Sequence, residues 1–232
     1  MKTFRSIAAP RSTGRGMARL ARRAGFTLVE LIAVFVIIGL LAAAVVPNVM
    51  SAIRSGEEAA CQQNLGKVRD GFLQYRQKYQ KWPNQSGVGF FASLVTDKVW
   101  KPTIANTKRL NCPGVDLESL DPGVDEIPVE DWYATENADS INGAWSSYAG
   151  RDIRRARLRG AQGSGKTAMM ADDNDPEGNH YTTTNVLWDD MTVRALELVE
   201  QQKAGLISED ETFIPVGPDS PIEGLRSLSI DK

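Results

Sequence analysis

The sequence predicts an α+β fold in which one long N-terminal helix packs on a small antiparallel β-sheet. Three observations support this expectation. An apolar run of 21 residues occupies positions 26–46, and a stripe of apolar side chains at helical spacing follows between Cys61 and Tyr79. Further along, residues 186–188 and 192–196 are typical of two strands joined by a tight turn.

The apolar run has the length and the flanks of a membrane-spanning helix. Within residues 26–46 only Thr27 and Glu30 are markedly polar, and a helix of that length reaches about 30 Å, enough to cross a bilayer core. The preceding 25 residues hold seven basic side chains and no acid, a bias that keeps the N-terminus in the cytoplasm. A carboxylate inside such a run is costly in lipid, so Glu30 is expected to be functional.

Three simpler interpretations compete for this segment. A secretory signal peptide, cut after the alanines at 42–44, would have a shorter apolar core and no place for Glu30. A plain anchor explains the length but not Glu30. A buried core helix explains neither the basic flank nor the charge asymmetry. Met1 and Met17 both remain usable starts, since residues 17–25 alone still form a basic leader.

Residues 25–31, Gly-Phe-Thr-Leu-Val-Glu-Leu, closely resemble the cleavage and methylation signature of type IV pilins and type II secretion pseudopilins. The resemblance implies that prepilin peptidase cuts after Gly25 and methylates the new amine of Phe26. It places Gly39 and Pro47 where pilin helices loosen or bend. It also implies that Glu30 pairs with the amine of a neighbouring subunit and sets the axial register, because a buried charge needs a partner.

The same resemblance implies a structural subunit and not an enzyme. The sequence of the head also shows no Ser/His/Asp, Cys/His or metal-binding pattern that would indicate catalysis. The subunit is expected in the inner membrane, with a cytoplasmic N-terminus and a periplasmic or extracellular head. It would assemble with its own copies through an inner-membrane assembly platform. A type II secretion pseudopilin is the alternative within this class, and a membrane-anchored ligand-binding protein or enzyme is the more remote one.

Composition separates the leader from the exported part. Without the seven leader cations, 20 basic and 29 acidic residues remain, and an acidic surface argues against nucleic-acid binding. The expected segments are a cleaved leader (1–25), a transmembrane and filament-core helix (26–47), an amphipathic stalk helix (48–82), a globular α+β head (83–200) and a peripheral extension (201–232). Trp82 and Pro83 are expected to end the stalk helix.

The two cysteines and the single histidine resemble those of a large-headed bacterial subfamily of pilin-like proteins. Cys61 begins the run Cys-Gln-Gln-Asn-Leu, and Cys112 precedes a proline. The resemblance, together with export, implies a disulfide between them, worth about 2–4 kcal/mol; two separate buried thiols are the alternative. His180 and Asp190 match a His-x9-Asp-Gly signature in which Met191 replaces the glycine, and we expect His180 to hydrogen-bond to the hairpin.

Two further patterns are weaker. A cluster of acids suits calcium or, more simply, a solvated turn; it comprises Asp172, Asp173, Asp175 and Glu177. An EF-hand is excluded because Thr184 stands where a glutamate is needed. No other cofactor is expected. Residues 160–167 formally match a P-loop but lack the strand before and the helix after that phosphate binding requires, so we interpret the match as chance.

Overall fold

The computed structural model describes residues 26–120, 122–123, 127–158, 163–172, 180 and 182–229. The chain divides into two compact units, Met1–Pro47 and Asn48–Lys232. One helix, α1 (Leu28–Tyr79), extends from the first unit into the second. Gly39 and Pro47, the two expected bend positions, both lie inside α1.

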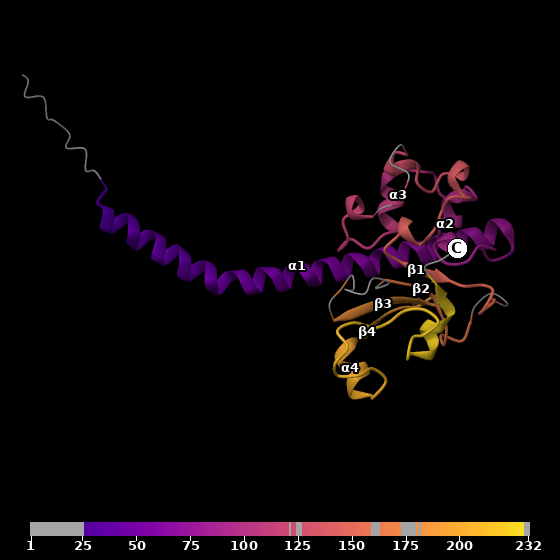
Figure 1. Ribbon diagram of the computed structural model, residues 1–232. Coiled ribbons are helices and arrows are strands. Elements are labelled where there is room, and N and C mark those ends of the chain that lie inside the picture. The colour runs from indigo at the N-terminus through magenta and orange to yellow at the C-terminus, as the bar shows by residue number, and fades with distance from the viewer. Residues whose placement is uncertain are drawn as a thin grey trace, which may run out of the picture. The chain divides into compact units, whose positions relative to one another are not determined.

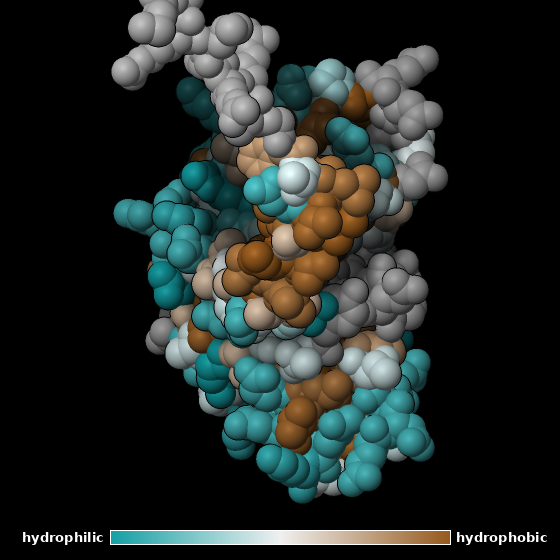
Figure 2. All heavy atoms as spheres, turned by 90° about the vertical axis from the view of Figure 1, so that its left-hand side faces the viewer, coloured by the Kyte–Doolittle hydropathy of each residue, from teal (hydrophilic) through white to brown (hydrophobic). Residues whose placement is uncertain are grey.

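Within the first unit, α1 is apolar on every side. Its large side chains are all exposed, among them Phe35, which keeps 64% of its surface accessible. Figure 2 shows these hydrophobic side chains gathered over the surface of this part of the helix. A helix that is hydrophobic all round normally lies in a membrane or inside an assembly.

Within the second unit, α1 is amphipathic. Cys61, Leu65, Val68, Phe72 and Tyr75 are buried, which confirms the predicted stripe. The helix ends at Tyr79, and the next residue has a positive φ of 56°. The predicted end before Trp82 and Pro83 is therefore confirmed to within a few residues.

The first core of the head lies between α1 and one face of a sheet. Helix α2 (Val88–Thr96) is buried along residues 88–95, because its side chains are apolar on nearly every side. Helix α3 (Ile104–Arg109) follows, capped by the Thr103 side chain. Residues 117–145 contain only short 3-10 turns among the described positions, and the sequence of this stretch, rich in Pro, Gly, Asp and Asn, is typical of irregular structure.

Five antiparallel strands form the sheet, in the order β4-β3-β2-β1-β5. Their bounds are β1 (Ala149–Arg151), β2 (Ala168–Ala171), β3 (Thr183–Trp188), β4 (Val193–Glu197) and β5 (Leu228–Ser229). The predicted hairpin is β3 and β4, paired from Thr183 opposite Glu197 to Leu187 opposite Val193. The sequence Trp-Ser-Ser-Tyr at residues 145–148 suggests a strand, but β1 begins only at Ala149, a few residues after a 3-10 turn.

Both faces of the sheet are covered. Met169 and Leu187 point into the core formed with α1 and α2, whereas Ala168, Val186 and Trp188 point into a second core. Figure 1 shows α1 and α2 on one side of the strands and α4 (Leu198–Lys203) on the other.

The C-terminal segment is not peripheral, as the sequence suggested, but part of this second core. Leu225 and Leu228 are buried in it together with Ile207 and Ile214. Strand β5 adds to the sheet edge by pairing with β1. Short apolar pieces separated by prolines therefore cover a sheet face without forming long elements of their own.

Candidate functional site

The start of α1 is closed by a capping box. The backbone N–H and the hydroxyl of Thr27 donate to Glu30 Oε2 at 2.8 and 2.9 Å, and the Glu30 N–H donates back to the Thr27 hydroxyl at 3.2 Å. This reciprocal arrangement satisfies N–H groups that a helix start leaves unpaired. The pattern Thr-x-x-Glu was readable in the sequence, yet Glu30 was interpreted only as a partner for an N-terminal amine, that of a neighbouring subunit or, before assembly, that of its own chain.

Glu30 therefore faces the first residues of its own helix. Phe26, the residue expected to become the N-terminus, is 84% exposed one position before Thr27. The expected cleavage residue, Gly25, lies outside the described residues. Helix α1 holds an 18-residue window of mean hydropathy 2.9 that is long and apolar enough to cross a membrane and has none of its residues buried in the chain itself.

The model of the prokaryotic N-terminal methylation motif matches residues 20–46. This chain has a prepilin-type N-terminus. The match includes Gly25, Phe26 and Glu30 and stops one residue before Pro47. No curated protein and no solved structure matches the chain. The motif and the apolar helix together indicate a membrane-anchored prepilin-type substrate.

The head of this prepilin-type chain contains a buried cluster of four polar side chains. Cys61, Cys112, Asp172 and His180 each place one ligand-type atom within 4.8 Å of the other three. The Cys61 thiol donates to Asp172 Oδ2 at 2.9 Å. His180 Nε2 lies 3.2 Å from Cys112 Sγ and 3.3 Å from Asp172 Oδ2.

Four separate parts of the chain position this cluster. Cys61 belongs to the buried face of α1, and Cys112 follows α3, where its N–H donates to the Ser147 hydroxyl at 2.8 Å. Asp172 comes directly after β2 and accepts from the backbone N–H and the side-chain amide of Asn185 at 2.6 and 2.9 Å. His180 precedes β3. The pairing of β2 with β3 thus aligns Asp172 beneath the helix.

Burial and mutual contacts shift the ionisation of these groups. Burial, reinforced by Cys112 and Asp172, raises the pKa of the Cys61 thiol well above its ordinary value. The contact with Cys61, followed by those with His180, lowers the pKa of Cys112. Burial alone lowers the pKa of His180, but its contacts with Asp172 and Cys112 outweigh burial and raise it.

His180 contacts the hairpin through its backbone and the cluster through its side chain. Its carbonyl accepts from the Thr183 N–H at the start of β3 at 3.2 Å, and its ring contacts Asp172 and Cys112. The Asp190 carboxylate accepts from Thr192. Both cysteines lie far from His180 in the sequence, and the fold brings them to it. Met191, which takes the place of the motif's glycine, has a positive φ of 67°, a backbone conformation that is strained for a residue other than glycine.

The two cysteines are free thiols in the structure, and both are buried. Their sulfur atoms nevertheless belong to the same cluster. The disulfide between Cys61 and Cys112 therefore stays a prediction. The sequence did not indicate that Asp172 and His180 belong to the same buried cluster as the two cysteines.

Of the four acids expected to suit calcium, Asp172 is the one that lies among the described residues. That side chain is fully buried and turned toward Cys61 and Asn185. The other acids of the loop, Asp173, Asp175 and Glu177, lie outside the described residues. Asp172 thus belongs to a mixed sulfur, nitrogen and oxygen cluster, which differs from the oxygen-only environment that calcium prefers.

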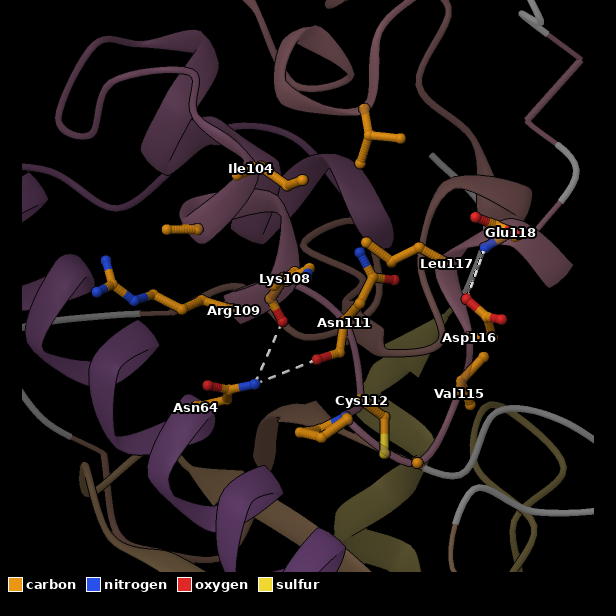
Figure 3. Close-up of a pocket in the computed structure, with 14 residues that line it drawn as sticks. Asn64, Ile104, Lys108, Arg109, Asn111, Cys112, Val115, Asp116, Leu117 and Glu118 are labelled. Carbon is orange, nitrogen blue, oxygen red and sulfur yellow. Dashed lines mark hydrogen bonds between the residues drawn. The ribbon is translucent and has the colours of Figure 1, made fainter. Parts of the chain in front are cut away.

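A pocket of about 910 Å³ opens beside the cluster (Figure 3). It is lined by α3, by residues 111–118 and by Asn64 of α1, whose amide donates to the carbonyls of Lys108 and Asn111, each at 3.3 Å. Cys112 forms part of its wall. Nothing in the sequence spacing pointed to this pocket, because its walls come from segments about 50 residues apart.

Proposed function

We propose that this protein is a structural subunit of a type IV pilus-like filament, matured by prepilin peptidase through cleavage after Gly25 and methylation of Phe26. The observation that carries the proposal is the first unit's helix: it lies almost entirely within the matched motif and leaves all its large apolar side chains exposed. Such a surface needs a membrane before assembly and neighbouring copies afterwards.

Glu30 is assigned the intermolecular contact that sets the register between subunits. In the single chain its Oε2 already accepts from Thr27. A carboxylate has about four lone-pair positions, so the capping box leaves room for a charge-assisted bond from the methylated amine of an adjacent subunit. Capping and pairing are compatible roles of one side chain.

The flanking charge supports the proposed location. Seven basic residues before position 26 keep the N-terminus on the cytoplasmic side of the inner membrane and place the acidic head in the periplasm or outside the cell. The partners are prepilin peptidase, the inner-membrane assembly platform and other copies of the chain. A short type II secretion pseudopilus would use the same features, and neighbouring genes for a secretion channel or for a retraction motor separate the two.

A second candidate, a membrane-anchored ligand-binding protein, is favoured by one observation only, the pocket between α1 and α3. In that case the N-terminal helix would be a simple anchor. Removing a charge from an anchor eases insertion and leaves the head's binding unchanged. The two candidates therefore differ in what Glu30 does.

Two substitutions separate the capping role of Glu30 from its charge. Glu30→Gln keeps a side chain that completes a capping box but removes the charge, whereas Thr27→Ala removes the cap and keeps the charge. We expect Glu30→Gln to insert, to be cleaved and to fold its head, yet to lower the yield of sheared filaments by about tenfold or more, the factor that a charge-assisted hydrogen bond represents.

Thr27→Ala serves as the matched control and should form filaments near the wild-type yield. The measurement is filament protein released by shearing, alongside the cleaved protein that stays in the membrane. Wild-type yield from Glu30→Gln with poor yield from Thr27→Ala would show that Glu30 acts only as a cap. A wild-type chain that is cleaved but never leaves the membrane would favour the anchored binding protein.

A further inference from the structure

We propose that Cys61, Cys112, Asp172 and His180 form a structural zinc site that joins α1 to the rest of the head. This site goes beyond the filament role, since it would hold the head together in a pilin and in a pseudopilin alike. The four residues come from α1, from the loop after α3, from the end of β2 and from the position before β3.

The distances between the four ligand atoms fit tetrahedral coordination of one zinc ion. Zinc lies about 2.0–2.3 Å from its ligands, which places neighbouring ligand atoms about 3.3–3.8 Å apart. Three pairs in the cluster measure 2.9, 3.2 and 3.3 Å, and all pairs lie within 4.8 Å. Shifts of a few tenths of an ångström around the centre would therefore complete the coordination.

The donor types select the metal. Two sulfurs, one imidazole nitrogen and one carboxylate oxygen are the ligand set of zinc, whereas calcium and magnesium take oxygen ligands. The site is closed, with Cys61, Cys112 and Asp172 almost fully buried and His180 8% exposed. Four protein ligands and no open position are typical of a structural zinc site and not of a catalytic one.

The surroundings orient these ligands. Asn185 donates to both carboxylate oxygens of Asp172, and Ser147 accepts the N–H of Cys112. The Tyr148 hydroxyl lies 3.3 Å from Cys61 Sγ, where it can donate to a thiolate. Two thiolates and one carboxylate exceed the charge of Zn²⁺ by one, and these hydrogen bonds spread the remaining negative charge.

Metal and disulfide exclude each other at this place. Binding of Zn²⁺ releases the two thiol protons to water and uses both sulfur atoms as ligands. A bond between Cys61 and Cys112 would instead remove both sulfurs from the ligand set and leave Asp172 and His180 as a simple pair. Whether the two cysteines are reduced or joined in the exported protein therefore decides between a zinc site and a disulfide.

The first test uses the wild-type mature protein, purified in detergent without chelator. Elemental analysis should find one zinc per chain, and a strong chelator should lower the temperature of head unfolding, with recovery on adding zinc. Replacement by Co²⁺ should give the visible absorption of a tetrahedral ion and a sulfur-to-metal charge-transfer band. Peptide mapping that finds Cys61 joined to Cys112, or metal analysis that finds no zinc or a different metal, overturns the proposal.

Variants then locate the ion. Cys112→Ser and His180→Gln should each retain less than about a tenth of the wild-type zinc, since loss of a ligand costs at least as much affinity as loss of a surrounding partner. Asp190→Asn, on the hairpin that the sequence motif paired with His180, should retain one zinc per chain. Full zinc content in His180→Gln overturns the assignment. If a variant does not fold, the Co²⁺ spectrum of the wild-type protein still tests whether two thiolates bind the metal.

Discussion

The two parts of α1 differ in how far their apolar side chains are buried within the chain. In the first unit Phe35 is 64% exposed, whereas in the second unit Phe72 is completely buried against Phe90 and Trp82. Both are phenylalanines of one continuous helix. The second part finds its apolar partners within its own chain, and the first part has a sequence suited to partners that the chain itself does not supply.

The difference in burial indicates that the two parts of α1 have different roles. The first part carries the methylation motif and the Thr27–Glu30 cap, which concern maturation and assembly. The second part carries Cys61 and the stripe that forms the head's core. Substitutions in the second part should therefore change the stability of the head, and substitutions in the first should not.

The largest expected effect comes from Phe72→Ala. Removing a fully buried phenylalanine should lower the free energy of unfolding of the head by about 3–5 kcal/mol, because a cavity remains. The matched change Phe35→Ala should leave head unfolding unchanged and reduce filament yield. All five tryptophans lie between Trp82 and Trp188, so their emission during denaturation reports on the head alone. Equal losses of head stability from both variants would contradict the division of α1.

A smaller effect distinguishes two glycines of the second part. A Cβ on Gly71 would lie 2.6 Å from the Trp100 ring and 2.8 Å from Leu94, whereas one on Gly66 would meet nothing within 4 Å. Gly71→Ala should thus cost about 1–2 kcal/mol, as overpacking outweighs the gain in helix propensity. Gly66→Ala should gain up to about 1 kcal/mol.

Denaturant midpoints of the two glycine variants, measured side by side in detergent, check this pair. A gain in stability from Gly71→Ala would mean that Trp100 does not pack against α1 as the structure has it. A clear loss from Gly66→Ala would mean that this face of the helix is covered.

The smallest effect concerns the end of α1. Gln80 has a φ of 56°, a conformation that glycine adopts without the strain felt by other residues. Gln80→Gly should therefore stabilise the head by about 0.5 kcal/mol. Its neighbour offers the control, since Lys81 does not have a positive φ and Lys81→Gly should give no gain. The readout is again the denaturant midpoint, and equal shifts for both variants would exclude relief of strain as the cause.

Periodic and local features of the fold were predictable from the sequence. The stripe from Cys61 to Tyr75 and the hairpin of β3 and β4 follow from spacing that repeats over many residues. Strand β5 was missed because two residues carry no period, and it exists only through its pairing with β1. The C-terminal segment was misjudged for the same reason, since its apolar residues are scattered between prolines.

The methylation motif and the buried cluster likewise differ in how far the sequence could predict them. The methylation motif is contiguous, so residues 25–31 were enough to recognise it. The capping box was equally local and was overlooked because Glu30 already had a role. The cluster around Asp172 has no sequence signature: positions 61, 112, 172 and 180 meet only because α1 crosses the sheet where β2 ends.

The most direct test of the central claim is the intact mass of the mature protein extracted from membranes. We predict a chain of residues 26–232 carrying one methyl group, with tandem fragmentation placing that group on the amine of Phe26. Gly25→Leu should insert but keep its leader, because the small residue at the cut is lost while the apolar run is unchanged. A mature chain that begins near Val45, or an uncleaved wild-type chain in cells with an active prepilin peptidase, would contradict the account.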